Sequence, residues 1–107
     1  MTQKNLNKIV EATLKSCKET LIRKGDEYVT TNDALANFKK SAALQGVTPK
    51  QALLGYMSKH TISIATMIGE DGDFPAEKWD EKIGDSINYL ILLRAIVAEE
   101  AANENIS

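Results

Sequence analysis

The residues best suited to chemistry lie on one stripe of the segment from Pro75 to Glu100. At about 100° per residue, Glu81, Asp85 and Asn88 fall on the same side of a helix. Asp85 and Asn88 lie where the segment becomes hydrophobic, and a buried carboxylate is costly unless it is paired, hydrogen-bonded or bound to a metal. Two interpretations are open: capping or pairing with basic side chains of a neighbouring helix, or a functional polar site. Three polar groups on one buried stripe exceed what capping needs and favour the functional site.

His60 is the one histidine, and it falls on the apolar side of another predicted helix, directly after Lys59. A histidine that faces Asp85 can act as an acid or base near neutral pH, or can be held as a structural pair. A second group of polar residues, Asp26 to Tyr28, follows the expected end of the first helix. We predict a loop there, where functional residues concentrate, with a solvated turn as the alternative.

A magnesium site is one possibility for the carboxylates. Glu81 and Asp85, one helical turn apart, offer oxygen ligands to Mg²⁺, which usually keeps several waters and is completed by substrate phosphates. That spacing alone is weak evidence, because surface helices contain it often. The chain has no P-loop, GxGxxG, HExxH or paired CxxC motif. Cys17, the single cysteine, is predicted to be a small buried side chain rather than a nucleophile, and one cysteine fits a reducing compartment.

Length and charge limit the classes of function. A chain of 107 residues makes one domain. The net charge of −2 argues against a nucleic-acid partner. The first residues contain no apolar signal segment and no run approaches 18 apolar residues, so we expect a cytoplasmic protein without membrane contact. Basic residues that could serve a small anionic ligand cluster at Lys15, Lys18, Arg23, Lys24, Lys39 and Lys40.

Hydrophobic periodicity predicts four helices with short connections. They cover about residues 5–23, from Asn32 or Asp33 to Gly46, from Pro49 to about 68, and 75–100, followed by a frayed tail over 101–107. Gly25 is expected to end the first helix, and Thr48 to Gln51 to start the third with a capping box. The inward residues are predicted to be Leu6, Ile9, Val10, Leu14, Cys17 and Leu21, then Ala34, Leu35, Phe38, Ala42 and Leu44, then Leu53, Met57, His60, Ile64 and Met67 or Ile68.

The fourth helix is apolar nearly all round, which is typical of a helix covered by neighbours on several sides. The expected fold is therefore an all-α, four-helix-bundle-like single domain over residues 1–107, with a long central C-terminal helix. The apolar surface of this helix exceeds what three short helices cover. That excess predicts a homo-oligomer, most simply a symmetric dimer.

The segment Glu81 to Leu90 resembles the EExGDxLxYL-like helix of the all-α nucleotide pyrophosphohydrolases of the MazG and dimeric dUTPase type. More closely, the chain is similar to small phage and prophage proteins related to the nucleotide modification associated domain. The motifs shared with those proteins are Lys24 with Asp26 and Tyr28, the pair Asn37-Phe38, the pair Lys59-His60, and Asp85 with Asn88-Tyr89. The resemblance spans about residues 21–97.

The chain departs from the MazG pattern at the metal ligands. The family site is made from an ExxE motif on one helix and an ExxD motif on the next, which together hold Mg²⁺ around a nucleoside triphosphate. Here Lys82 stands where the glutamate of ExxD would be, and no ExxE occurs upstream. These departures from the family pattern favour binding over hydrolysis. The residues expected to receive phosphate and base are Lys24, Asn37, Lys59 and His60, with Asp85 and Asn88 orienting the ligand or reading its polar edges. Asp26 and Tyr28 complete the set of expected ligand-binding residues.

Three functions are open at this point. The first is a non-catalytic nucleotide-binding oligomer of phage type, acting in the host cytoplasm in nucleotide handling or in sequestering a nucleotide signal. The second is a Mg²⁺-dependent nucleotide pyrophosphohydrolase, with Glu81 and Asp85 on the metal and His60 or Lys59 on phosphate. The third is a helical interaction protein without a small ligand, in which Asp85, Asn88 and His60 form a buried polar network.

Overall fold

The computed structural model describes residues 1–28, 32–70 and 72–106, except for the side chains of residues 27, 28, 105 and 106. It contains the helices α1 (Gln3–Tyr28), α2 (Ala36–Gln45), α3 (Pro49–Gly69) and α4 (Ala76–Ile106), and the described part has no strand. The all-α fold predicted from the sequence is confirmed. Helix α4 continues to Ile106, through most of the segment predicted as a tail.

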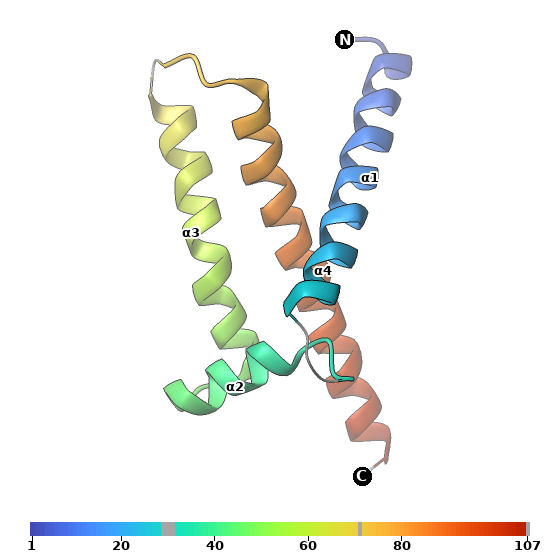
Figure 1. Cartoon of the computed structure of the whole chain (residues 1–107), viewed down its shortest axis with the longest axis vertical. Helices are drawn as coiled ribbons and strands as arrows, with labels where there is room; N and C mark the ends of the chain where they lie inside the picture. Colours follow the sequence, from blue (N-terminus) through green and yellow to red (C-terminus); the bar gives the residue numbers. More distant parts are fainter. Residues whose placement is uncertain (29–31, 71, 107) are drawn as a thin grey trace.

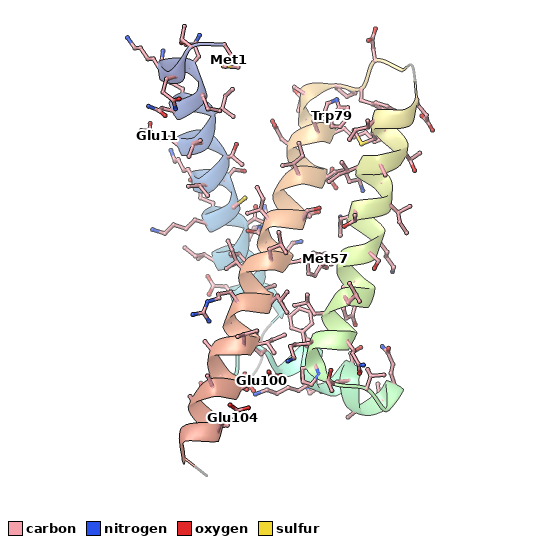
Figure 2. The ribbon with its side chains drawn as sticks, turned by 180° about the vertical axis from the view of Figure 1, so that it is seen from behind. Met1, Glu11, Met57, Trp79, Glu100 and Glu104 are labelled. Atoms are coloured by element: carbon pink, nitrogen blue, oxygen red, sulfur yellow. The ribbon has the colours of Figure 1, made fainter. Side chains whose placement is uncertain are left out.

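Helix α4 is central, as predicted, because it packs against both α1 and α3, while α2 packs against α3 (Figure 1). The buried core cluster is formed by Leu35, Leu53 and Ile96, one residue from each of three segments. Around it pack the partly buried side chains Phe38, Met57, Tyr89, Leu92 and Leu93. Figure 2 shows Met57 and Trp79 in the space between α3 and α4. The tightest packing is thus between α3 and α4, with α2 closing one end.

The local signals around α3 are confirmed. The Thr48 hydroxyl accepts a hydrogen bond from the Gln51 amide at 3.2 Å, and the Gln51 side chain accepts one from the Thr48 amide at 2.9 Å. This reciprocal pair is the capping box that the sequence predicts. At the end of α2, Gly46 adopts the left-handed conformation with φ of 67°, which glycine reaches without steric penalty. Gly69 ends α3, also as predicted.

The predicted end of α1 is wrong. Helix α1 passes through Gly25 and ends at Tyr28, so Asp26 to Tyr28 belong to its last turn rather than to a loop. A glycine inside a helix costs only up to about 1 kcal/mol, which tertiary contacts can outweigh. Such contacts exist in the residues just before Gly25, because Leu21 is half-buried and Nζ of Lys24 lies 3.9 Å from Oδ1 of Asp85 on α4.

The predicted start of α2 also needs correction. The Asp33 carboxylate accepts a hydrogen bond from the Leu35 amide, and the Asp33 carbonyl accepts one from the Ala36 amide. Asp33 therefore forms a turn that precedes the helix, a common alternative use of aspartate. Of the side chains predicted to point inward, Leu35 and Ala42 are buried, but Ala34 is exposed and Leu44 is 90 % exposed. Leu44 lies about 200° from Ala42 around the helix and so faces the other side.

The apolar side of α1 is only partly covered. Cys17 is buried and Leu21 is half-buried, as predicted. The earlier members of the same predicted set are exposed in this chain, namely Leu6, Ile9, Val10 and Leu14. Figure 1 shows why: the N-terminal half of α1 leans away from the other helices, whereas its C-terminal half crosses α4.

Candidate ligand-binding site

Asp85 lies where three helices meet. Its Oδ2 atom is 3.6 Å from Nδ1 of His60 on α3, and its Oδ1 atom is 3.9 Å from Nζ of Lys24 on α1. The Asp85 side chain is 17 % exposed, so these groups interact in a partly desolvated setting. Both distances are longer than a hydrogen bond. The Asp85 carboxylate therefore interacts electrostatically with two basic groups, and neither of them donates a hydrogen bond to its oxygen atoms.

Asn88, one turn after Asp85, is the one buried polar residue among those whose burial is described, at 7 % exposure. Its Oδ1 atom has no hydrogen-bond partner among the described residues, and the same is true of Nδ1 of His60. Buried polar atoms are usually hydrogen-bonded, and leaving one unpaired costs about 1–3 kcal/mol. Two buried polar atoms without a described hydrogen bond thus lie close to the Asp85 carboxylate.

A cavity of about 370 Å³, here called the polar cavity, lies between α1 and α4. Its α1 wall consists of Ser16, Cys17, Thr20, Arg23 and Lys24, and its α4 wall of Asp80, Glu81, Gly84, Asp85 and Asn88. Hydroxyls and cations thus face carboxylates across the gap. The predicted stripe of Glu81, Asp85 and Asn88 does share one side of the helix.

A second cavity of about 380 Å³, here called the aromatic cavity, lies at the C-terminal end of α1, between α2 and α4. Its lining residues are Leu21, Lys24, Gly25, Ala34, Asn37, Phe38, Asp85, Asn88, Tyr89 and Leu92. Its lining combines aromatic and aliphatic side chains with four polar ones, those of Lys24, Asn37, Asp85 and Asn88. Lys24, Asp85 and Asn88 line both cavities. The two hollows are therefore neighbours on either side of the contact between Lys24 and Asp85.

Two groups beside Asp85 have shifted pKa values. Burial raises the pKa of the Tyr89 phenol, and the negative charges of Asp85 and Tyr56 raise it further. Burial likewise raises the pKa of the Cys17 thiol, with a smaller contribution from Asp85. Both groups stay protonated near neutral pH. Cys17 is a small buried side chain, as predicted, and its raised pKa keeps the thiolate, which is the nucleophilic form, scarce near neutral pH.

The Tyr89 ring also contacts the histidine of the site. The centroids of the Tyr89 and His60 rings are 5.3 Å apart with a tilt of 35°. This contact fixes the imidazole on the α3 side of Asp85. Tyr89 thus joins the wall of the aromatic cavity to the polar group around the carboxylate.

Five of the predicted ligand-binding residues come together: Lys24, Asn37, His60, Asp85 and Asn88. Asp26 and Lys59 do not join them, because both are exposed and neither lines a described cavity. The Tyr28 side chain lies outside the described residues. The prediction missed Ser16 and Thr20 of the α1 wall, whereas Arg23 was among the basic residues expected to serve an anionic ligand. The spacing of these residues puts them on one side of α1, but it does not say which helix that side meets.

The residues fit a protein-held Mg²⁺ site poorly. Glu81 and Asp85 do line one cavity, together with Asp80. However, among the described residues no three histidine, cysteine or acidic side chains converge on a point that could hold a metal ion. The ammonium of Lys24 also faces Asp85, and a cation there repels a metal.

Gly84 lies on the side of α4 that packs against Cys17 of α1. A Cβ atom built at Gly84 would lie 3.8 Å from Sγ of Cys17, which is an ordinary van der Waals distance. Packing of α1 on α4 therefore does not require a glycine here. If position 84 requires a glycine, the requirement would come from a molecule bound in the polar cavity.

Comparison of the chain with family models, with curated proteins and with solved structures gave no match. Within the described residues, no helix combines the length and the apolar character needed to cross a membrane. The candidate site is therefore argued from its own geometry.

Proposed function

We propose that the protein binds a nucleotide, or another small phosphorylated ligand, without hydrolysing it. The observation that carries this proposal is the set Lys24, Asp85 and Asn88, which lines both cavities, and in which the buried amide oxygen of Asn88 has no hydrogen-bond partner among the described residues. An amide oxygen accepts hydrogen bonds, so it suits an amino or ring N–H group of a base. Each cavity falls within the range of about 300–1,000 Å³ that is usual for small-molecule sites.

The two cavities suggest how such a ligand would lie. The base would enter the aromatic cavity, between the side chains of Phe38 and Tyr89, with Asn37 and Asn88 at its edges. Base–aromatic contacts contribute about 1–3 kcal/mol per base. The phosphate would lie on the α1 wall of the polar cavity, where Arg23 and Lys24 supply positive charge.

The charges of the polar cavity favour a small phosphate group. Its lining holds the cations Arg23 and Lys24 but also the carboxylates of Asp80, Glu81 and Asp85. Three carboxylates against two cations would repel a triphosphate unless a metal ion came with it. The preferred ligand is therefore a nucleoside monophosphate or a cyclic nucleotide, which carries less negative charge.

The proposal includes the biological setting that the family resemblance implies. The protein would be a homo-oligomer of phage type in the cytoplasm of the host cell, and would handle nucleotides or sequester a nucleotide signal. The competing hydrolase would use Glu81 and Asp85 to bind Mg²⁺ and would need the metal to bind its substrate. The competing interaction protein would use Asp85, Asn88 and His60 only as a buried network.

A thermal-shift and calorimetric screen against linear and cyclic nucleotides, with and without Mg²⁺, separates these functions. A ligand that binds only the folded state stabilises it by RT ln(1 + [L]/Kd), about 2.7 kcal/mol at one hundred times Kd. A metal-independent shift supports the proposal. A shift that requires Mg²⁺ overturns it in favour of the hydrolase, and no shift with any nucleotide overturns it in favour of the interaction protein.

Two matched lysine variants then locate the ligand. Lys24 lines both cavities, whereas Lys59 is exposed on α3 and lines none of the described ones. Lys24→Ala should weaken binding by roughly tenfold or more, since a hydrogen bond to a charged group contributes about 1.5–3 kcal/mol. Lys59→Ala should leave the affinity unchanged. Equal losses in both variants would place the ligand elsewhere.

A further inference from the structure

Two hydrogen-bond acceptors of α4 line the aromatic cavity without a donor among the described residues. Asp85 and Asn88 lie three positions apart, so their side chains share one side of the helix. The Oδ1 atom of Asn88 is buried and has no described partner. The Asp85 oxygens lie 3.9 Å from Nζ of Lys24 and 3.6 Å from Nδ1 of His60, and both distances exceed a hydrogen bond. The cavity therefore offers two neighbouring acceptors to a molecule that enters it.

Such acceptors select a ligand by its pattern of donors. An ionised carboxylate and an amide oxygen offer only lone pairs, so each requires an N–H or O–H group opposite it. The side chain of Asp85 is 17 % exposed and the residue Asn88 is 7 % exposed. Because this setting is largely desolvated, a ligand that leaves either acceptor unpaired binds weakly, and discrimination between similar ligands is strong.

We propose that the aromatic cavity is selective for guanine over the other common bases. This inference rests on the proposed function and deepens it, because it names the base of the bound nucleotide. Guanine carries a ring N1–H group and a 2-amino group side by side. The Asp85 carboxylate would accept the N1–H hydrogen and one amino hydrogen, and Oδ1 of Asn88 would accept the second amino hydrogen. Both acceptors and all three donors would then be paired.

The cation beside the carboxylate suits the third polar group of guanine. Lys24 lines the aromatic cavity as well, and its ammonium group contains donors only. The carbonyl oxygen O6 of guanine is next to N1–H, on the side opposite to the 2-amino group, and would face this ammonium. Arg23 of the polar cavity is then the cation left for the phosphate. One donor and two acceptors on the protein complement the one acceptor and two donor groups of guanine.

The other bases match these groups less well. Adenine and cytosine each have one amino group beside a ring nitrogen whose lone pair would face the Asp85 carboxylate. Uracil and thymine have one N–H group between two carbonyl oxygens, so a carbonyl would face an acceptor of the protein. His60 does not supply a compensating donor to the base, because it is not among the residues that line this cavity. Each mismatch sets two lone pairs against each other or leaves a buried acceptor unpaired.

Isothermal titration calorimetry on the full wild-type chain tests the selectivity. The ligands are guanosine, inosine and adenosine, each as the 5′-monophosphate and as the 3′,5′-cyclic monophosphate. Inosine differs from guanosine only by the absence of the 2-amino group. Within each series, the inosine nucleotide should bind roughly tenfold more weakly than the guanosine nucleotide, and the adenosine nucleotide roughly a hundredfold more weakly. Because no residue is changed, effects on folding cannot produce this order.

One substitution then assigns the selectivity to the carboxylate. Asp85→Asn replaces an acceptor by an amide donor of the same shape, so it should weaken the guanosine nucleotide by roughly a hundredfold and bring its affinity close to that of the adenosine nucleotide. A merely structural role of Asp85 would weaken both nucleotides equally and keep their ratio. Asp73→Asn, an exposed carboxylate that lines none of the described cavities, is the control and should leave the ratio at the wild-type value.

The outcomes separate this inference from nucleotide binding itself. Equal affinities for the guanosine and inosine nucleotides, tighter binding of the adenosine nucleotide, or a ratio that Asp85→Asn does not change would each overturn the selectivity for guanine while leaving a nucleotide-binding protein. If no nucleotide of either series binds, the proposed function fails, and the selectivity fails with it.

Discussion

His60 and Asp85 face each other across the interface of α3 and α4, with Nδ1 and Oδ2 3.6 Å apart. The two residues are separated by 25 positions in the chain, and neither has a described hydrogen bond that explains its burial. Lys24 reaches the same carboxylate from α1. Asp85 therefore couples three helices, and its charge is the natural target for the first test.

Replacing Asp85 by asparagine should lower the pKa values of both Tyr89 and Cys17. The negative charge of Asp85 contributes to raising both, after burial, so both values should move toward normal but remain raised. Phenolate absorbance, with Tyr89→Phe as the reference, reports the tyrosine, and the pH dependence of alkylation reports the thiol. Asp26→Asn, an exposed carboxylate outside the cavities, is the control. An unchanged Tyr89 titration would contradict the proximity of the two residues.

Gly84→Ala should stabilise the protein by about 0.5–1 kcal/mol, since glycine is a poor residue inside a helix. The added methyl group has room, at an ordinary contact distance from Sγ of Cys17. Chemical denaturation measures the change. Gly46→Ala is the matched control with the opposite expected sign. Because φ is 67° at this position, the substitution should destabilise the protein by about 1 kcal/mol. If Gly84→Ala also weakens the ligand, the missing side chain serves the polar cavity.

Leu53→Ala should destabilise the fold by about 2–5 kcal/mol, because this side chain is the most completely buried one, at 1 % exposure. Its neighbour Leu54 is 55 % exposed, and Leu54→Ala should change the free energy of unfolding by less than about 0.5 kcal/mol. Urea denaturation at one fixed protein concentration compares the two, since association also affects stability. Similar losses would mean that α3 is rotated relative to α4.

Lys39→Met should flatten the dependence of stability on pH at both extremes. Lys39 pairs with Asp33 before α2 and with Glu99 on α4. The hydrogen bond from Lys39 lowers the pKa of Asp33, so this carboxylate contributes stability above its ordinary value of 3.8, lost as pH falls through the lower folded value. The pKa of Lys39 is raised, mainly by Asp33, so its contribution is present below 10.5 and lost as pH rises through the higher folded value.

Melting temperatures across the pH range measure this effect. Lys40→Met, at the exposed neighbouring position, is the control and should keep the wild-type curve. Because the groups are exposed, the effect should shrink at high salt. A wild-type pH profile in Lys39→Met would show that the three charges do not act together.

Much of the fold could be predicted because its signals are local. The capping box of Thr48 and Gln51 needs only four consecutive residues, and Gly46 needs only its own freedom to adopt positive φ. Gly25 misled the prediction for the same reason: the residue favours a helix end, but contacts with distant parts of the chain continue the helix. The second helix is predicted to begin at Asn32 or Asp33, whereas Asp33 forms the turn before the helix.

The candidate site could be predicted in part. Lys24, Asn37, His60, Asp85 and Asn88 do gather, since polar residues on buried stripes tend to meet. Lys59 follows His60 directly, but one residue turns a helix by about 100°, which directs it to solvent. The pairing of α1 with the polar side of α4 depends on tertiary packing. Periodicity within α1 cannot reveal which of its residues face that side.

The unpaired amide oxygen of Asn88 has a consequence for how this chain can evolve or be engineered. A leucine there would remove a buried acceptor without a partner and should raise the melting temperature, while erasing the contact proposed to read the ligand. In a selection for thermal stability alone, Asn88→Leu should therefore be among the first substitutions to appear. If an amide is retained at position 88, the reason is then a requirement other than the stability of the chain without its ligand.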